Sequence, residues 1–319
     1  MNAPSPLISV ALCTYNGERW LREQLDSVLA QDDATIEVVA LDDRSSDGSV
    51  ALLREYAARD PRVRVFGNDA NLGPARSFER AMTLCRGAFI APCDQDDVWE
   101  PEKLARLLQA IGAADLAYCD SRYIDEHGRF SGGDVSDHLS MMSGREPLQF
   151  LFANSVSGHA ALLRRGVFER ARPFPAGVFH DWWLALCAAA GEGVVYLDAP
   201  LVRFRRHGAA FSTLGHGQKT RDPSRQRLWL EVRRNLMVAH ARTTLRGHER
   251  AQALLDAFDL ARDQRRHLPL LRELWRVRAA APPAGGNAML NGVRQQVRFL
   301  RKLRRARGEP PLEPRRLSF

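Results

Sequence analysis

The segment AFIAPCDQDDVW, residues 88–99, decides the fold class of this chain. Its first five residues, Ala88–Pro92, are mostly apolar and predict a buried strand. Asp94, Asp96 and Asp97 follow almost directly after that strand. In an open parallel sheet, ligands bind outside the carboxyl ends of the strands, and these carboxylates stand at such an end. The segment therefore predicts a parallel sheet with an acidic site along one edge.

The first 120 residues repeat this order of an apolar strand, a polar cluster and an amphipathic helix. Thr14–Glu18 and Asp42–Asp47 are the polar clusters after the first two strands, and Asn16 is expected to cap the first helix. The alternation predicts an α/β fold with a doubly wound, mostly parallel, Rossmann-like sheet. No GxGxxG follows the first strand, which argues against a dinucleotide-dependent oxidoreductase. Strands are expected at 7–12, 36–41, 63–66, 88–92 and 116–119.

The two parts of the chain carry opposite charge. Residues 1–200 contain 19 Lys and Arg against 29 Asp and Glu, a net charge of −10. Residues 201–319 contain 27 Lys and Arg against 9 Asp and Glu, a net charge of +18. Such an asymmetry indicates different roles. We expect an α/β domain at residues 1–215 and a basic helical region at 216–319.

The cysteines and the N-terminus place the chain in a reducing compartment. The N-terminal MNAPSPLISV lacks the basic and long apolar parts of a signal peptide, and no run of 18 apolar residues predicts a membrane span. No cysteine pair has close metal-ligand spacing, so free thiols and a cytoplasmic location are expected. The five cysteines are Cys13, Cys85, Cys93, Cys119 and Cys187.

The three aspartates of DQDD are the most specific signal for a cofactor. Closely spaced carboxylates repel one another unless a cation compensates their charge. Mg²⁺ and Mn²⁺ prefer oxygen ligands and bind through one or two carboxylates together with substrate phosphates. The alternative is a solvated acidic turn that caps the next helix, which explains Asp97 equally well but Asp94 and Asp96 less well.

Four segments together resemble the family 2 glycosyltransferases of the GT-A fold. The likeness extends over about residues 7–210, and HDWW (180–183) and FRRHG (204–208) make it most similar to the rhamnosyltransferase-like branch. It implies a GT-A nucleotide-sugar-binding catalytic domain. The four segments are TYNGERWLREQLDSVLAQ (14–31), LDDRSSDGS (41–49), NLGPARSFERAM (71–82) and DQDDVW (94–99).

The resemblance assigns donor-side roles to several residues. It implies a metal site at Asp96, Asp94 and His207, although His207 is equally well explained as a surface histidine in a basic loop. For Asp42, the end of a strand suits a hydrogen bond from a pyrimidine N3–H, while an Asx turn is the alternative. Tyr15 suits either base stacking or the core. The implied nucleotide-sugar-binding residues are Thr14, Tyr15, Asp42, Arg76 and Asp94.

The resemblance also implies a carboxylate base, commonly in a Glu-Asp pair. Here the pair is His180-Asp181, so Asp181 is the predicted catalytic base and His180 replaces the first acid. An acceptor hydroxyl must lose a proton as it attacks, which a carboxylate can accept; a helix cap is the alternative for Asp181. Trp182 and Trp183 are assigned to the acceptor side or the core, with one expected in each place. His159 is also predicted on the acceptor side.

The C-terminal region has a different pattern. Leu290, Val293, Val297 and Leu300 recur at helical spacing among arginines. A basic amphipathic helix is typical of a membrane-surface or partner-binding element, and a packing helix with a solvated basic face is the alternative. A nucleic-acid partner is not expected, because no such motif is present and the acidic part would repel phosphates. Arg205 and Arg206 are expected to assist the departing diphosphate.

These observations predict a metal-dependent inverting glycosyltransferase with Mn²⁺ or Mg²⁺ as cofactor. The expected donor is a dTDP- or UDP-sugar carrying rhamnose or another hexose. The expected acceptor is a glycan or lipid-linked glycan of bacterial surface polysaccharide synthesis, at the inner face of the cytoplasmic membrane. The alternatives are an inactive nucleotide-sugar-binding scaffold and a nucleotidyltransferase, although CTYNGE lacks the Gly-rich, basic loop that the latter needs. The donor sugar, linkage, acceptor and oligomeric state do not follow from the sequence.

Overall fold

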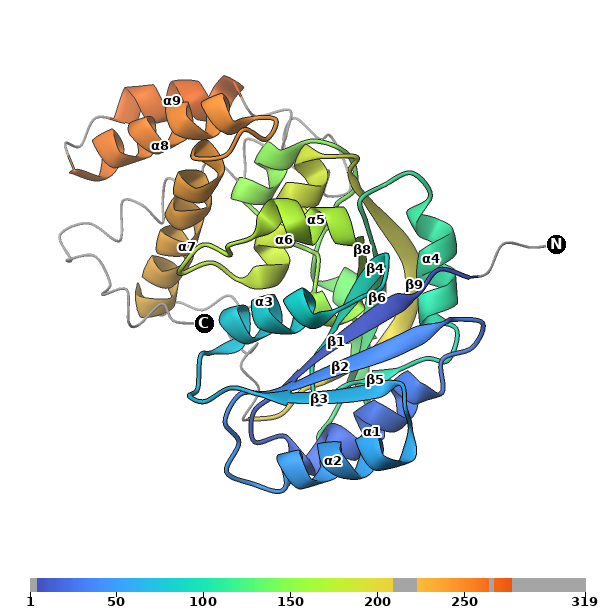
Figure 1. The fold of residues 1–319 in the computed structure, drawn as a ribbon. Helices are drawn as coiled ribbons and strands as arrows, with labels where there is room; N and C mark the ends of the chain where they lie inside the picture. The colour runs from blue at the N-terminus through green and yellow to red at the C-terminus, as the bar shows by residue number, and fades with distance from the viewer. Residues whose placement is uncertain (1–4, 209–222, 264–266, 277–319) are drawn as a thin grey trace.

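A mixed sheet forms the centre of the computed structural model, which describes residues 5–208, 223–263 and 267–276 (Figure 1). Its strands are β1 (Ile8–Thr14), β2 (Ile36–Asp42), β3 (Val63–Gly67), β4 (Phe89–Cys93), β5 (Val98–Trp99), β6 (Leu116–Ile124), β7 (Phe130–Asp134), β8 (Ala161–Arg164) and β9 (Val194–Arg205). The order is β3-β2-β1-β4-β8-β6-β9-β5, and β7 pairs with β6. Four of the ladders, β1–β2, β1–β4, β2–β3 and β6–β9, are parallel. The predicted doubly wound, mostly parallel α/β sheet is confirmed.

Helices cover both faces of this sheet. One face carries α1 (Glu18–Leu29), α2 (Ser49–Arg59) and α4 (Lys103–Ile111), and the other carries α3 (Pro74–Leu84), α5 (Arg165–Ala171) and α6 (His180–Ala190) (Figure 1). Strand side chains alternate between the faces, so Val10 and Leu12 join one core while Ala11 joins the other. All three are fully buried. Covering by helices on both sides explains why these strands are continuous apolar runs in the sequence.

Strands near the site are longer than the apolar runs predicted. Strand β6, expected to end at residue 119, continues to Ile124, and β9 runs without a break from Val194 to Arg205. A register shift at Cys119 and Asp120 lets the β6–β9 ladder absorb the irregular residues after Leu197 and resume beyond them. As a result, β9 carries its last residues to the edge where the DQDD segment lies.

The prediction that Asn16 caps α1 is wrong. Asn16 has a left-handed φ of 50°, and its Oδ1 accepts a hydrogen bond of 2.8 Å from the backbone N–H of Ser46. Its side chain thus ties the loop after β1 to the loop after β2. Helix α1 starts after Gly17, where a Cβ atom would lie 2.2 Å from Gln95 Oε1. Glycine at this position permits the loop after β1 to approach the DQDD segment.

The C-terminal helices α7 (Pro223–Ala241), α8 (His248–Asp263) and α9 (His267–Arg276) continue the core on the α6 side. Leu236 of α7 and Phe258 of α8 belong to the same buried cluster as Trp182. The GT-A sheet with C-terminal helices is therefore confirmed, and the boundary at residue 215 stays a prediction. The basic amphipathic stretch at 290–305 lies outside the described residues.

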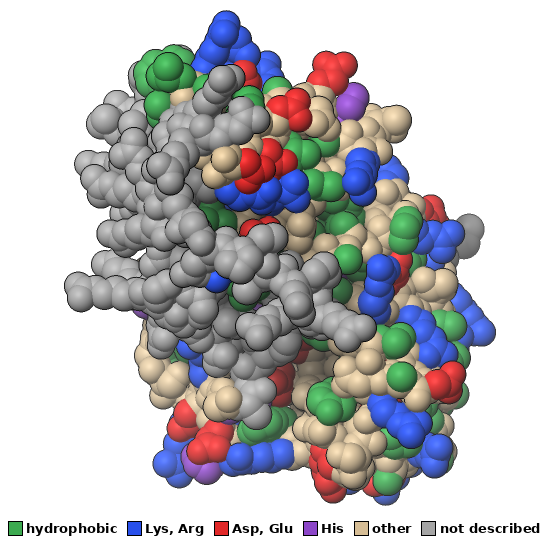
Figure 2. All heavy atoms as spheres, turned by 90° about the vertical axis from the view of Figure 1, so that its left-hand side faces the viewer, with side chains coloured by type: hydrophobic (Ala, Val, Ile, Leu, Met, Phe, Trp, Pro, Cys, Tyr) green, Lys and Arg blue, Asp and Glu red, His purple; other side chains and the backbone are tan. Residues whose placement is uncertain are grey.

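The described surface beside these helices has mixed charge. Figure 2 shows Lys and Arg side chains spread among acidic and apolar ones on this face, in the part drawn in colour. None of the described helices has the length and apolar character needed to cross a bilayer. All five cysteines are free thiols, as predicted.

Candidate active site

Gln95 joins the loop after β1 to the DQDD segment. Its Oε1 accepts hydrogen bonds from Thr14 Oγ1 at 2.6 Å and from the backbone N–H of Tyr15 at 2.8 Å. Its Nε2 donates to the Tyr15 carbonyl at 3.2 Å. Thr14 is buried by these contacts, whereas Tyr15 is 49% exposed. Of the two alternatives for Tyr15, the structure places the ring at the surface beside the site instead of in the core.

Asp42 forms the predicted Asx turn and keeps one carboxylate oxygen unpaired, while its role in binding a base stays a prediction. Its Oδ2 accepts a hydrogen bond of 2.9 Å from the backbone N–H of Ser45, which forms an Asx-type turn. Its Oδ1 is buried and has no hydrogen-bond partner among the described residues. A buried carboxylate oxygen without a donor is costly, so a ligand N–H at this position would remove an existing penalty.

The neighbouring Asp43, which the sequence did not single out, positions the loop before α3. Its two carboxylate oxygens accept hydrogen bonds from the backbone N–H groups of Leu72 and Gly73, at 2.8 and 2.9 Å. Arg76, one turn into α3, forms an ion pair with Glu79 at 2.7 Å. No described contact brings Arg76 to the other predicted site residues, and it is half-exposed.

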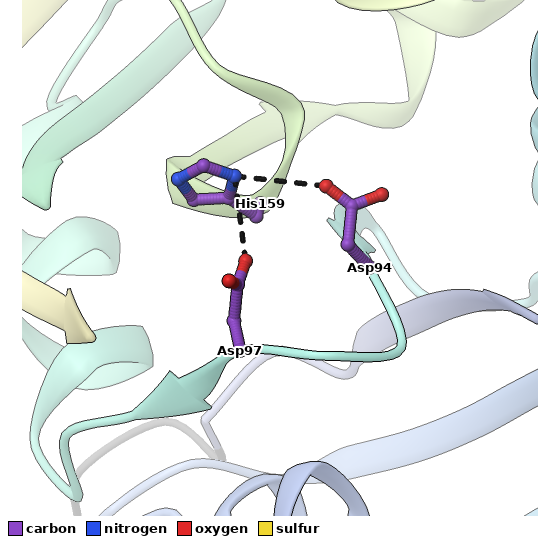
Figure 3. Close-up of side chains that lie close together, drawn as sticks. All are labelled: Asp94, Asp97 and His159. Carbon is purple, nitrogen blue, oxygen red and sulfur yellow. Dashed lines mark ion pairs between the residues drawn. The ribbon is translucent and has the colours of Figure 1, made fainter. Parts of the chain in front are cut away.

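Figure 3 shows His159 between two aspartates of the DQDD segment. Its Nδ1 lies 3.6 Å from Asp94 Oδ2 and 3.4 Å from Asp97 Oδ2, and its Nε2 is 3.1 Å from Ser121 Oγ. The side chains of His159 and Asp97 are 4% and 1% exposed, while that of Asp94 is 42% exposed. Ligand atoms of these three residues lie within 4.8 Å of one another, close enough for a metal ion among the described residues.

Burial and charge act in opposite directions on these groups. Burial raises the pKa of Asp97 to about 7, although His159 opposes the rise. Burial would lower the pKa of His159, but Asp97 and Asp94 outweigh it and raise that pKa. Burial would likewise raise the pKa of Asp94, but the hydrogen bond and charge of His159 lower it. The two aspartates therefore favour the protonated form of His159, on the inner side of the cluster.

A second histidine meets the DQDD segment from the end of β9. His207 Nε2 lies 2.8 Å from Asp96 Oδ2, and the imidazole packs against the ring of Trp20 with centroids 4.0 Å apart. The Asp96 side chain is 17% exposed. The two residues, 111 positions apart in sequence, thus form a largely buried pair, with the His207 side chain 5% exposed.

Arg205 holds the DQDD segment in place, and the prediction that it assists a diphosphate is wrong. Its backbone N–H donates to Asp97 Oδ1 at 3.0 Å, and its Nε donates to the Asp96 carbonyl at 2.8 Å. Its remaining guanidinium nitrogens bond to the carbonyls of Asp125 and Glu126 and pair with Glu23. The side chain is 1% exposed and has no free donor directed at a ligand.

Asp181 and His180 lie in the first turn of α6. Burial raises the pKa of Asp181, and the backbone N–H of Gly158 partly offsets this by a hydrogen bond to the carboxylate. Burial lowers the pKa of His180, whose ring stacks on Phe78 with centroids 4.1 Å apart. Phe179 occupies the N-cap position, and Asp181 Oδ1 accepts the N–H of Trp182 at 2.6 Å. Asp181 thus both bonds to the backbone of the first turn of α6 and has a raised pKa.

Both tryptophans belong to the core, so the expected acceptor-side tryptophan is not present at this position. The indole N–H of Trp182 donates to the Phe150 carbonyl, and that of Trp183 donates to the Ala171 carbonyl at 2.7 Å. Both side chains are almost fully buried. The helix here packs on α5 and on the 3₁₀ turn at Pro147–Leu151, which leaves no indole face for a sugar. His159 is likewise buried against the aspartates instead of lining an acceptor surface.

Lys103 is a buried cation beneath the site that the sequence did not indicate. Its Nζ donates to the His159 carbonyl at 2.6 Å and lies 3.0 Å from the centre of the Trp99 ring. Burial lowers its pKa to about 8. A lysine in the first turn of a predicted amphipathic helix is ordinarily solvated, so no local pattern distinguishes it.

The chain matches known proteins over the part that forms this site. Residues 9–172 match the model of glycosyl transferase family 2. The chain belongs to this family. It spans 14% and 71% of the lengths of the first two curated relatives that it matches. The succinoglycan biosynthesis protein ExoO of Rhizobium meliloti is 36% identical over 118 residues, which are 36% of this chain and 33% of ExoO.

Two solved structures share the fold of this chain. Staphylococcus aureus TarS in complex with UDP-GlcNAc has a TM-score of 0.58 and 16% identity, covering 94% of this chain and 89% of TarS. The mannosyltransferase PcManGT of Pyrobaculum calidifontis, in complex with GDP-Man and Mn²⁺, has a TM-score of 0.55 and 18% identity, covering 95% and 88%. At these identities the likeness concerns the fold alone.

Proposed function

We propose that the chain transfers a sugar from a nucleotide-sugar donor to a hydroxyl of a glycan acceptor, with inversion at the anomeric carbon. The observation that carries this proposal is one sheet edge with three kinds of carboxylate. Asp42 has an oxygen without a donor, Asp94 and Asp96 are accessible and paired with histidines, and Asp181 has an elevated pKa. Asp42 suits the nucleobase of the donor, Asp94 and Asp96 suit its diphosphate, and Asp181 suits the acceptor hydroxyl.

The nucleotide end of the donor is proposed to lie on the loops after β1 and β2. The unpaired Asp42 Oδ1 would accept a hydrogen bond from the N3–H of a pyrimidine. The buried carboxylate oxygen and the buried N–H would then each have a partner. The half-exposed ring of Tyr15 offers a flat surface for stacking. Thr14 acts by holding Gln95, which keeps this loop beside the DQDD segment.

Asp94, Asp96 and His207 are proposed as the ligands of a divalent cation, whereas the ligand atoms that converge within 4.8 Å among the described residues are those of Asp94, Asp97 and His159. Carboxylate and imidazole are ligands that Mn²⁺ accepts, and Asp94 and Asp96 are accessible to a phosphate. Such a cation would neutralise charge on the leaving diphosphate. The Asp94, Asp97 and His159 group suits this role less well, because Asp97 and His159 are buried and neutralise each other. We infer that His159 supports the ligands from behind.

Asp181 is proposed as the general base. The carboxylate lies near enough to Asp94 for that charge to raise its pKa further, which places it beside the donor cluster. A raised pKa improves its ability to accept a proton from an attacking hydroxyl. His180, packed on Phe78, would shield one side of Asp181 from water.

The finer identity of the reaction rests on likeness. The resemblance of DQDDVW, HDWW and FRRHG to the rhamnosyltransferase-like branch supports dTDP-rhamnose, or another dTDP- or UDP-hexose, as donor. The partial match to a succinoglycan biosynthesis protein supports surface polysaccharide synthesis, with a glycan or lipid-linked glycan as acceptor. We further propose that residues 1–215 are catalytic and that the basic region 216–319 keeps this cytoplasmic enzyme at the anionic inner face of the membrane.

A donor screen tests the proposal. The full chain is incubated with a panel of dTDP-, UDP- and GDP-sugars with and without Mn²⁺, and both the melting temperature and nucleoside diphosphate release are measured. One donor should raise the melting temperature in a Mn²⁺-dependent way and release its diphosphate. Binding without release in any condition identifies an inactive scaffold, and pyrophosphate release from a nucleoside triphosphate identifies a nucleotidyltransferase.

A further inference from the structure

The short 3₁₀ turn η3 (Gly158–Ala160) lies between the DQDD segment and the start of α6. Its residues contact both the DQDD segment and the start of α6. The His159 ring lies between Asp94 and Asp97, and the Gly158 backbone packs against Asp181, where a Cβ atom on the glycine would lie 3.7 Å from the Asp181 Cβ. A displacement of this turn would therefore move the proposed donor cluster and the proposed base together.

Gly158 makes the contact with α6 very close. A Cβ atom at this position would lie 3.0 Å from His180 Nε2 and 3.7 Å from the Asp181 Cβ. The missing side chain allows the backbone of the turn to pack directly on the first residues of α6. The backbone hydrogen bonds of the turn itself are short-range: the Ala160 N–H donates to the Ser157 carbonyl at 3.1 Å, and the Ala161 N–H donates to the Gly158 carbonyl.

Lys103 anchors this turn from below. Its fully buried ammonium donates to the His159 carbonyl at 2.6 Å, across 56 positions of sequence. The opposite side of the ammonium is covered by the Trp99 ring, 3.0 Å from its centre. A buried lysine carries a large desolvation cost unless its surroundings compensate. The carbonyl, the ring and the nearby aspartates supply that compensation, so the position of the ammonium and the position of the turn are linked.

We propose that Lys103 is a positioning residue that fixes the turn at 158–160 and thereby aligns Asp94 with Asp181. Lys103 touches neither donor nor acceptor in this arrangement. Its action passes through the His159 carbonyl to the His159 ring on one side and to the Gly158 backbone on the other. The role in catalysis rests on the proposed function, whereas the mechanical link between Lys103 and the turn does not.

The mechanical link is tested by hydrogen exchange of the full chain. Lys103→Met keeps the apolar stem and removes the donor, so exchange in peptides spanning 157–160 should rise about tenfold or more as this hydrogen bond and its neighbours open. Leu107→Ala is the matched control, because Leu107 is fully buried one turn further along α4 and has no contact with the turn among the described hydrogen bonds. It should lower the melting temperature yet leave exchange at 157–160 within about twofold. Equal acceleration in both variants would overturn the proposal.

The catalytic consequence is tested with the donor found in the screen. Lys103→Met should lower kcat by about 10- to 100-fold, because misplacement of reacting groups by about 1 Å has effects of this size. In an Asp181→Asn background the same change should lower kcat by no more than about twofold, since the two act through one contact. Lys103→Gln, which keeps a donor, should regain part of the loss. Additive losses, or no regain by Gln, contradict the proposal. If the wild type turns over no donor, the proposed function fails and hydrogen exchange alone decides the role of Lys103.

Discussion

Two histidines meet the same DQDD segment; both are buried, and it is their aspartate partners that differ in exposure. His207 pairs with Asp96 at the edge of the site, where both Asp96 and Asp94 remain open to a ligand. His159 lies behind the segment, with its Nδ1 near Asp94 and Asp97, and is buried together with Asp97. Identical residue types thus form one pair, His207–Asp96, whose carboxylate is partly exposed, and one, His159–Asp97, whose carboxylate is buried.

This difference indicates that burial, more than residue type, separates ligand binding from structural support. A buried histidine between two carboxylates compensates charge that water would otherwise have to solvate. A partly exposed carboxylate such as that of Asp96 can instead bind a cation that reaches it from solvent. The following predictions test whether the His207–Asp96 pair binds the ligand and the His159–Asp97 pair supports the structure.

The largest effect is expected at the His207–Asp96 pair. Asp96→Ala should lower kcat/KM by about 10³-fold or more, because a bound cation supplies several kcal/mol of charge stabilisation. Excess EDTA should have the same effect on the wild type and none on the variant. The measurement is Mn²⁺-dependent donor binding by calorimetry together with turnover. Full turnover of Asp96→Ala would place the cation elsewhere or remove it from the mechanism.

Asp181→Asn should separate chemistry from binding. The amide keeps the shape and cannot accept a proton, so turnover should fall about 10²- to 10⁴-fold while donor affinity changes little. In the wild type, burial raises the pKa of Asp181, and activity should therefore fall as pH drops through that elevated pKa. The acid limb of the pH profile should vanish in the variant. A folded Asp181→Asn protein with normal turnover shows instead that Asp181 is only a helix residue, because Asn and Asp serve helix starts about equally.

Paired histidine substitutions compare the two clusters directly. His159→Leu leaves the buried Asp97 without its partner and should cost about 3–5 kcal/mol of stability, the usual effect of breaking a buried pair. His207→Leu should change stability by less and raise the Mn²⁺ concentration needed for half-maximal activity. The measurements are denaturant unfolding and a Mn²⁺ titration of both variants. If His159→Leu instead raised the Mn²⁺ requirement and His207→Leu lowered the stability, the metal site would be the cluster of Asp94, Asp97 and His159.

The smallest effect concerns His240 in α7, far from the chemistry. Burial lowers its pKa to about 4, and both ring nitrogens are buried without a hydrogen-bond partner among the described residues. Because the unfolded chain binds a proton near pH 6.5 and the folded chain does not, stability should be full above pH 6.5 and fall towards pH 4. The expected loss is about 3 kcal/mol. His240→Phe should flatten this part of a stability–pH curve measured by urea unfolding; a parallel curve would assign the acid sensitivity to other groups.

The strands and the acidic edge could be predicted because their signals are local. Apolar runs such as Ala88–Pro92 and the aspartates directly after them are adjacent in sequence, and a parallel sheet brings such strand ends to one edge. The roles of Arg205 and Lys103 could not be predicted in this way. Arg205 reaches Asp96 across 109 positions, and Lys103 reaches the His159 carbonyl across 56. Nothing near either residue in sequence indicates that its charge is buried.

For the two tryptophans, too, the local sequence predicts the helix but not the burial of the side chains. HDWW predicts a helix start with aromatic residues, and a sugar-stacking face and a core position are equally compatible with that pattern. Packing of α6 on α5 and on the turn at 147–151 decides that both indoles are core. Burial is a property of the neighbours, which periodicity along one helix does not specify.

The sequence by itself determined the alternation of strands and helices, the placement of carboxylates at strand ends and the family of the chain. These depend on local propensity, on apolar periodicity and on segments in a fixed order. Only the tertiary structure decided which histidine pairs with which aspartate, that Arg205 and Lys103 act as buried supports, and that the tryptophans belong to the core. The physical reason is that burial and hydrogen bonding are set by residues distant in sequence, and these determine whether a charged side chain binds a ligand or stabilises the fold.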